Sequence, residues 1–192
     1  VHPSVPARSV TELTQLARSR PGQLTCGSSG LPSQLAVELY KVLTGTDIVH
    51  VPYKGQAPAM IDLIAGHVQI SFASMPVVLG HVRQGRLRLL AQAGAKRASS
   101  LPDVPTVVES GVPGFVVSSG FSLVGPAGIP RPIAEKLNDA LAKSLRDPAN
   151  RKSLIDQGAE PVGNTIEEHA AIIKSEIEKW RRVIKEAGIE PQ

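Results

Sequence analysis

The sequence predicts an α/β fold with a predominantly parallel sheet. Short β-branched and apolar runs alternate with helical patterns of about 8 to 12 residues, which is typical of consecutive βαβ units. Glycines and prolines separate the segments, as expected at turns and helix ends. The 192 residues, 42% of them hydrophobic, are enough to bury the core of one large domain or of two small lobes.

The first half of the chain carries this alternation. A helix is predicted to begin after Ser9, which has the spacing of a capping box with Glu12, and to end near Pro21. Helices alternate with strands beyond this point, so the strands should lie parallel. The periodicity predicts strands over 24–25, 48–51, 68–72 and 87–91, and helices over 34–43, 58–65 and 76–85.

The second half of the chain has a different character. A short helix is predicted after Thr106, followed by an extended run over 115–124 with a hinge-like break at 118–120. Further helices are predicted over 132–145, over 148–157 and from Thr165 onward. The last helix carries an apolar stripe formed by Ile173, Ile177, Trp180 and Ile184. Because this stripe needs a partner surface, we expect residues 121–192 to belong to a second unit, separate from residues 1–120.

Composition excludes several classes of function. The net charge of +4 comes without a basic stripe, and aromatic residues make up only 3%, so no nucleic-acid partner is predicted. A single cysteine, Cys26, cannot form an intramolecular disulfide, and no cysteine and histidine cluster has the spacing of a metal site, so no metal or cofactor is predicted. The longest apolar runs fall short of the ~20 residues that span a bilayer, and the first residues lack the pattern of a signal peptide.

Two glycine-bearing loops, each between a predicted strand and a predicted helix, form the candidate binding site. The first runs from Cys26 to Gly30, and the second runs from Tyr53 to Pro58. The free backbone N–H groups of a helix start bind anions, and the loops of neighbouring parallel strands meet at one edge of a sheet. The sequence therefore predicts a site for a small anionic molecule.

The same residues fit other functions less well. Ser28 and Ser29 lie at a strand-to-helix turn, as a nucleophile would, but the G-x-S-x-G spacing and identifiable triad partners are lacking, so no enzyme activity is predicted. Hydrogen bonding of these hydroxyls to an anion is favoured over simple helix capping. Tyr53 either packs in the core or closes over the ligand. His50 and Cys26 are interpreted as a surface or capping histidine and as a small buried hydrophobe.

A series of motifs in order resembles a known family. They are Gly27 to Gly30, Val49 to Ala59 (VHVPYKGQAPA), Leu101 to Thr106 (LPDVPT), Gly111 to Phe115, Gly125 to Gly128 and Gly158 to Gly163 (GAEPVG). This order is similar to that of the Bug family, the TctC-like extracytoplasmic solute receptors of tripartite tricarboxylate transporters. The resemblance covers essentially the whole chain.

The resemblance implies a type II periplasmic-binding fold, in which two α/β lobes close over a carboxylate: a di- or tricarboxylate, an amino acid or an aromatic acid. It implies a periplasmic receptor that presents this ligand to membrane permease subunits. Residues 1–120 would form the second, ligand-binding lobe, and residues 121–192 the hinge return and C-terminal helices of an incomplete first lobe. The ligand-binding residues that it implies are Ser28, Ser29, Gly30, Ser33, Tyr53, Lys54, Gly55, Ala57 and Ala73.

The chain departs from the family pattern at several points. Its first loop is shorter than usual, Gln34 stands where a histidine is frequent, and Ala73 stands where many members have an aspartate. The first-lobe segment with a Pro-Gly-Gly loop is not part of this sequence, so the helices after residue 126 would lack the sheet that they cover in the family. We therefore expect a homodimer through residues 126–192. Two alternatives to a receptor remain: a non-binding oligomer, and the effector-binding domain of a LysR-type regulator.

Overall fold

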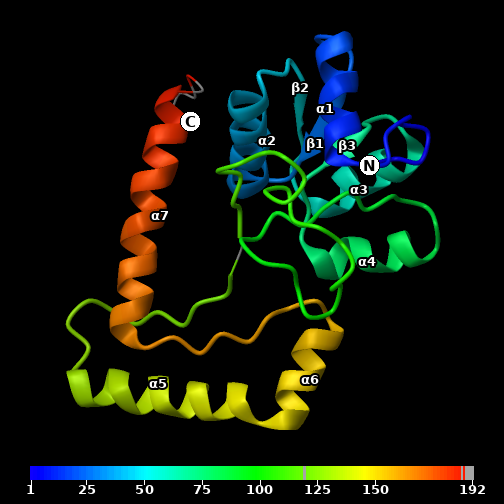
Figure 1. Ribbon diagram of the computed structural model, residues 1–192. Helices are drawn as coiled ribbons and strands as arrows, with labels where there is room; N and C mark the ends of the chain where they lie inside the picture. The colour runs from blue at the N-terminus through cyan, green and yellow to red at the C-terminus, as the bar shows by residue number, and fades with distance from the viewer. Residues whose placement is uncertain (119, 187, 189–192) are drawn as a thin grey trace.

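The computed structural model describes residues 1–118, 120–186 and 188. Figure 1 shows two parts: a compact α/β body, residues 1–118, and an arm, residues 120–186, that extends away from it and returns. The elements of the body are α1 (Val10–Ser19), β1 (Thr25–Ser28), α2 (Leu31–Thr44), β2 (Val49–Pro52), α3 (Gln56–Ala65), β3 (Ile70–Ser71) and α4 (Met75–Arg83). The arm contains α5 (Arg131–Arg146), α6 (Pro148–Asp156) and α7 (Ile166–Glu186).

A parallel sheet in the order β2-β1-β3 organises the body, which confirms the predicted α/β class. One hydrophobic cluster covers the face that carries Cys26 and contains residues of α1 and α2. A second cluster contains residues of α3 and α4 together with Val51 and Val68. The sheet is therefore covered by helices on both faces, as parallel sheets usually are.

Local signals explain where the helices of the body begin and end. The Ser9 hydroxyl accepts a hydrogen bond from the backbone N–H of Glu12 at 3.1 Å, so the predicted cap of α1 is confirmed. Gly45 ends α2 in the left-handed conformation, with φ of 59°, and Gly66 ends α3 in the same way. The structure extends α2 and α3 by one turn or less beyond the predicted bounds.

Three predicted elements of the connecting segments are wrong. Residues 87–91 do not form a strand, because the N-terminal segment takes their backbone groups: Arg88 N–H donates to Val1 O at 2.8 Å. The hydrogen bonds of a capping box form at Thr106, but only a turn follows it. The described residues of 115–124 contain no strand, and Ser119, in the predicted hinge, lies outside the described residues.

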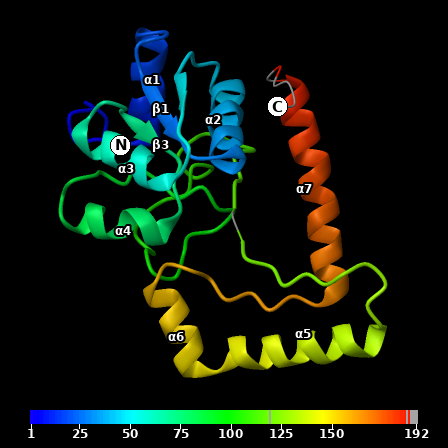
Figure 2. The ribbon, with the colours of Figure 1, turned by 180° about the vertical axis from the view of Figure 1, so that it is seen from behind.

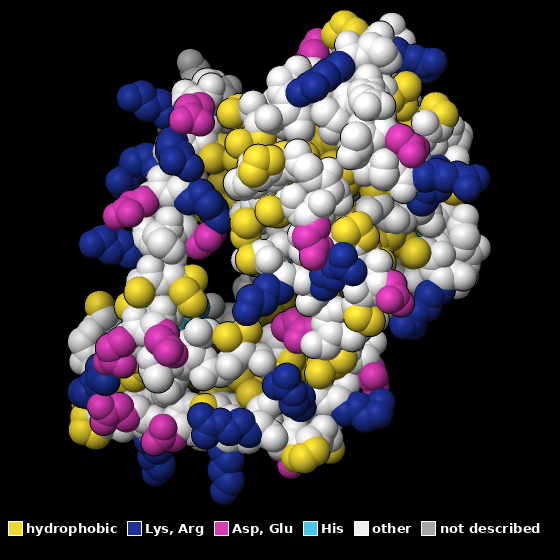
Figure 3. Space-filling view, in the orientation of Figure 1, with side chains coloured by type: hydrophobic (Ala, Val, Ile, Leu, Met, Phe, Trp, Pro, Cys, Tyr) yellow, Lys and Arg dark blue, Asp and Glu magenta, His cyan; other side chains and the backbone are white. Residues whose placement is uncertain are grey.

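The arm is held to the body at a few points around an opening that is visible in the space-filling view (Figure 3). The α7 helix packs against α2 and contributes Val183 to the first cluster, and Trp180 lies against that cluster as predicted. Near the end of α6, Gly158 contacts Met75 so closely that an added Cβ would lie 2.7 Å from Met75 Cγ. Glu160 then accepts a hydrogen bond from Ser99 N–H at 2.5 Å.

The rest of the arm is exposed. Val183 is the one buried residue among the described residues of the arm, and α5 and α6 bury none. Figure 2, which shows the molecule from behind, agrees that α5 and the lower half of α7 have no element of the body beside them. The most exposed large hydrophobic residues of the arm are Phe121, Leu123, Val124, Ile133, Leu137, Val162 and Ile177. The division between residues 120 and 121 into two lobes stays a prediction.

Candidate ligand-binding site

Three helix N-termini follow the carboxyl ends of the three parallel strands. The strands β1, β2 and β3 lead into α2, α3 and α4 through loops of two to three residues. The N-cap residues are Gly30, Gly55 and Ser74, and no side chain forms a capping hydrogen bond at any of the three. The first backbone N–H groups of these helices are therefore available to an anion. We call this group of helix N-termini the cradle.

Glycine is required at two of the three N-caps by backbone conformation. Gly30 has φ of 96° and Gly55 has φ of 150°, values that other residues rarely adopt. Nothing lies within 4 Å of the position where a Cβ would be at either residue, so there is open space beside both. The glycines therefore set the path of the two loops.

The hydroxyls of Ser33 and Ser28, two of the predicted ligand-binding groups, already form hydrogen bonds inside the protein. Ser33 Oγ accepts from Ser29 N–H at 2.9 Å and donates to Gly30 O at 3.0 Å, so Ser33 braces the loop. Ser28 is only 3% exposed, and its Oγ lies 2.5 Å from His50 Nε2. Burial lowers the pKa of His50, whose ring lies near Glu38 of α2. The Ser29 hydroxyl remains half-buried at the mouth of the loop.

Tyr53 ties the second loop to the body. Its N–H donates to Ser28 O at 2.9 Å, and its hydroxyl donates to Asp62 Oδ2 of α3 at 2.7 Å. This hydrogen bond to the carboxylate raises the pKa of Tyr53 to about 12, and it lowers the pKa of Asp62, to which His67 also contributes. The ring packs over Gly27 and belongs to the second hydrophobic cluster. Of the two roles left open for Tyr53, the geometry favours packing.

The other predicted residues lie on the outside of the cradle. Lys54, Ala57 and Ala73 are exposed, and Lys54 has no hydrogen bond or ion pair with the described residues. The side chain of Gln56 donates to Ser74 Oγ at 3.4 Å, which connects the N-termini of α3 and α4. The nine predicted residues thus share one edge of the sheet, with Ala73 on the opposite side of β1 from the second loop.

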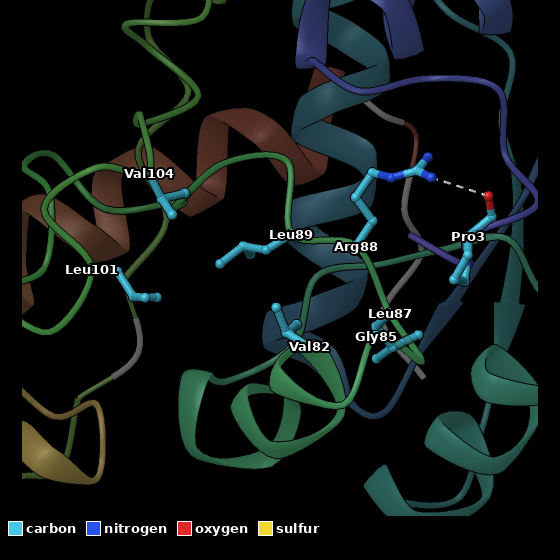
Figure 4. Close-up of a pocket in the computed structure, with 8 residues that line it drawn as sticks. All are labelled: Pro3, Val82, Gly85, Leu87, Arg88, Leu89, Leu101 and Val104. Carbon is cyan, nitrogen blue, oxygen red and sulfur yellow. Dashed lines mark hydrogen bonds between the residues drawn. The ribbon is translucent and has the colours of Figure 1, made fainter.

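Two hollows lie beside the body, and the second of them begins at Gln56 and Ala57, at the N-terminus of α3. One of about 450 Å³, shown in Figure 4, is lined by Pro3, Val82, Gly85, Leu87, Arg88, Leu89, Leu101 and Val104. The guanidinium of Arg88 is not free to bind a ligand there, because it donates hydrogen bonds to the carbonyls of Pro3, Val5 and Ala7. The other, of about 710 Å³, is a mostly apolar groove along α3 and α4 that includes Ile61 and Arg86. Neither contains the loop serines, and the cradle itself is open.

The arrangement at the cradle provides hydrogen-bond donors for an anion. Backbone N–H groups, a serine hydroxyl and the Lys54 ammonium are groups that recognise a carboxylate. The pair of Ser28 and His50 has the atoms of a nucleophile and its base, but Ser28 is buried and no carboxylate among the described residues is hydrogen-bonded to His50. Binding is therefore the chemistry that the site supports.

Comparison with known proteins identifies the family. Residues 1–189 match the TctC family, described as the tripartite tricarboxylate transporter family receptor. The chain belongs to this family. Protein BugT of Bordetella pertussis is 36% identical over 189 residues, which are 97% of this chain and 58% of BugT. The family is one of solute-binding receptors, and the fold and recognition predicted from the sequence are confirmed.

Solved TctC-like structures superpose on the chain. An R. palustris protein solved with adipate has a TM-score of 0.90 and 38% identity, and the match covers all of this chain and 65% of that protein. MatC of Rhodopseudomonas palustris, solved with bound malate, has a TM-score of 0.79 and 28% identity, with 95% and 64% of the two chains covered. The chain thus spans a little over half of BugT and about two thirds of the two solved proteins.

One residue of the cradle was missed in the sequence. His50 was interpreted as a surface or capping histidine, and the structure instead bonds it to Ser28. The signal that could have found it is the strand register, in which His50 pairs with Cys26 and thus lies on the same face as Ser28. Cys26 is fully buried, as predicted, and burial raises the pKa of its thiol to about 12. None of the helices in the described part of the chain is both long and apolar enough to cross a membrane.

Proposed function

We propose that this chain binds a small carboxylate at the cradle and serves as the solute receptor of a tripartite tricarboxylate transporter. The observation that carries the proposal is the presence of three helix N-termini without side-chain caps at one edge of the parallel sheet. Dicarboxylates in two TctC-like proteins, adipate and malate, support this class of ligand. The open site suits a ligand that meets further protein on its other side.

In this proposal the backbone does most of the binding. N–H groups at the starts of α2 and α3, next to Gly30 and Ala57, donate to the carboxylate oxygens, and each helix terminus adds about 0.3 to 1 kcal/mol. Ser29 contributes its hydroxyl, and the exposed Lys54 attracts the anion from the rim. Tyr53 and Ser33 act by holding the loops in place.

The cellular setting is also a proposal. As a member of the TctC receptors, the chain would act in the periplasm and present its ligand to the permease subunits of the transporter. It would have no catalytic step of its own. Selectivity among carboxylates would depend on groups facing the exposed rim at Lys54, Ala57 and Ala73.

A ligand panel tests the proposal. Thermal unfolding of the chain is measured with adipate, malate, succinate, citrate, glutamate, aspartate and nicotinate, followed by calorimetry on any hit. A ligand at a hundred times its Kd should stabilise the fold by about 2.7 kcal/mol and raise Tm by about 5 to 10 °C. Flat melting temperatures across the panel would contradict carboxylate binding by this chain.

Two matched glycine variants locate the binding at the cradle. Gly30→Ala strains the start of α2, and Gly45→Ala strains the end of the same helix; neither site has an atom within 4 Å of the new methyl group. Both should lose about 1 kcal/mol of stability. Only Gly30→Ala should lose binding, and equal affinities in the two variants would place the ligand elsewhere.

We further propose that a second copy of the chain covers the arm. Ten large hydrophobic side chains from Phe121 to Ile177 are exposed, among them Phe121 at 106%. Together they present on the order of 800 Å² of surface, the area that one partner contributes to an interface of standard size. Light scattering at increasing concentration should show a dimer that Leu137→Glu disrupts. A monomer throughout would exclude the dimer and assign the surface to another segment or subunit.

A further inference from the structure

His50 has a contact that anion binding by backbone groups does not explain. Its Nε2 lies 2.5 Å from Ser28 Oγ, across from β2 to the last residue of β1. Ser28 immediately precedes Ser29 and Gly30, where the first loop of the cradle begins. The contact therefore joins a titratable ring on one strand to the start of a loop on the next.

The same serine is also bonded through its backbone. Ser28 O accepts the N–H of Tyr53, the first residue of the second loop, at 2.9 Å. The side chain of Ser28 is thus bonded to His50 of β2, and its carbonyl is bonded to Tyr53, the residue that follows β2. These two bonds fix the spacing of the first two loops of the cradle.

The direction of the side-chain bond depends on the protonation of His50. A neutral imidazole can accept a hydrogen bond at Nε2 or donate one from it, whereas an imidazolium can only donate. When His50 is protonated, Ser28 Oγ must accept, so its own hydrogen has to find another acceptor. Ser28 is 3% exposed and has little access to bulk water. A carboxylate at the adjacent N–H groups would provide that acceptor.

We propose that His50 is a positioning residue of the cradle, whose protonation turns the Ser28 hydroxyl toward the bound carboxylate, so that binding strengthens as the pH falls. This inference rests on the proposed function, because it requires a carboxylate at the cradle. It goes beyond that function because it couples carboxylate binding to the uptake of a proton by His50.

The charged groups around His50 allow its ring to be neutral in the free protein and protonated in the complex. Glu38 and Lys41 of α2 face the ring and form an ion pair with each other at 2.9 Å, and β1 contributes the hydroxyl of Ser28 and the thiol of Cys26. Burial lowers the pKa of His50 and outweighs the influence of Glu38, which raises it. The ring is therefore neutral at neutral pH in the free protein, and a bound anion beside Ser28 raises its pKa.

The sign of the effect follows from linkage. Because the bound state has the higher pKa, it takes up a proton as the pH falls through that pKa, and affinity rises until the pKa of the free state is passed. Each unit of difference between the two pKa values corresponds to a gain of roughly tenfold in affinity. We expect a full effect of about tenfold in affinity.

Calorimetry with adipate and malate at about pH 6 and pH 8 tests the inference on the wild-type chain, His50→Gln and His2→Gln. Glutamine keeps a hydrogen bond to Ser28 without a titratable ring. His2 is the matched control, because it lies against Gly66 and bonds Ser4, on the amino side of β3. Protonation of the ligand itself affects all three proteins equally.

The wild-type chain and His2→Gln should gain more affinity on acidification than His50→Gln, by a factor that approaches roughly tenfold as the pH passes below the pKa of His50 in the free protein. NMR of the imidazole nitrogens should show the pKa of His50 rising when adipate or malate is added. Binding with the same pH dependence in all three proteins would overturn the role of His50 and leave the proposed function intact. Absence of binding in the wild-type chain at both pH values would overturn both.

Discussion

Helices α2 and α5 have similar lengths and both carry an apolar face, but their surroundings are opposite. The α2 helix of the body buries six residues, including Leu35 and Leu39. The α5 helix of the arm buries none, although Ile133, Leu137 and Leu141 recur at every fourth position. The difference teaches that an amphipathic pattern determines a helix and its apolar face, whereas the partner of that face comes from elsewhere.

The largest expected effect compares one leucine from each part. Leu63→Ala, at a side chain that is 2% exposed in the body, should lower the free energy of unfolding by about 2 to 5 kcal/mol. Leu137→Ala, in the arm at 46% exposure, should change it by less than about 0.5 kcal/mol in the monomer. Urea denaturation at low protein concentration measures both. Similar losses would mean that the face of α5 is covered in solution, which would break the comparison.

A second test concerns the hydrogen bond from Tyr53 to Asp62. Tyr53→Phe should lower stability modestly near neutral pH, because it leaves the carboxylate of Asp62 with one donor fewer. The pKa of Asp62 is lowered first by Tyr53 and then by His67, so its contribution is present above the unfolded value of 3.8 and lost as the pH falls through the folded pKa. The variant should therefore lose less stability on acidification than the wild-type chain. Equal acid titrations of the two proteins would contradict this.

The smallest expected effect compares two helix caps. Ser9 caps α1 in the body, and Thr165 caps α7 in the arm with a hydrogen bond from Glu168 N–H at 3.1 Å. Ser9→Ala should lower global stability by about 1 kcal/mol. Thr165→Ala should instead speed hydrogen exchange in the first turns of α7 while leaving the body unchanged. If exchange in the body also rises, the arm and the body unfold as one unit.

Much of the fold was predictable because its signals are local. Capping residues, glycine stops and apolar periods placed all seven helices that the described residues contain, and the alternation predicted the parallel sheet. The predicted strand over 87–91 failed because the N-terminal segment occupies the backbone of Arg88, a contact across more than eighty residues. Pairings at such separations leave no trace in local periodicity.

The candidate site, like the fold, was predictable from the sequence only where its signals are local. The two glycine loops were visible because the conformation of Gly30 and Gly55 requires that residue type. The pairing of Ser28 with His50 was not, since it depends on the register between two strands. The packing role of Tyr53 was also hidden, because its partner Asp62 is defined only once α3 lies against the sheet.

The contact of Gly158 with Met75 restricts how the arm can move. The segment that carries α5 and α6 is attached to the body near Val117, whose N–H donates to Ala93 O, and again at Gly158. An ion pair at 2.6 Å between Arg131 of α5 and Glu167 of α7 holds the segment at a third place. Because the contact at Gly158 lies on Met75, the first residue of α4, a displacement of α6 relative to the body would first act on a helix start of the cradle.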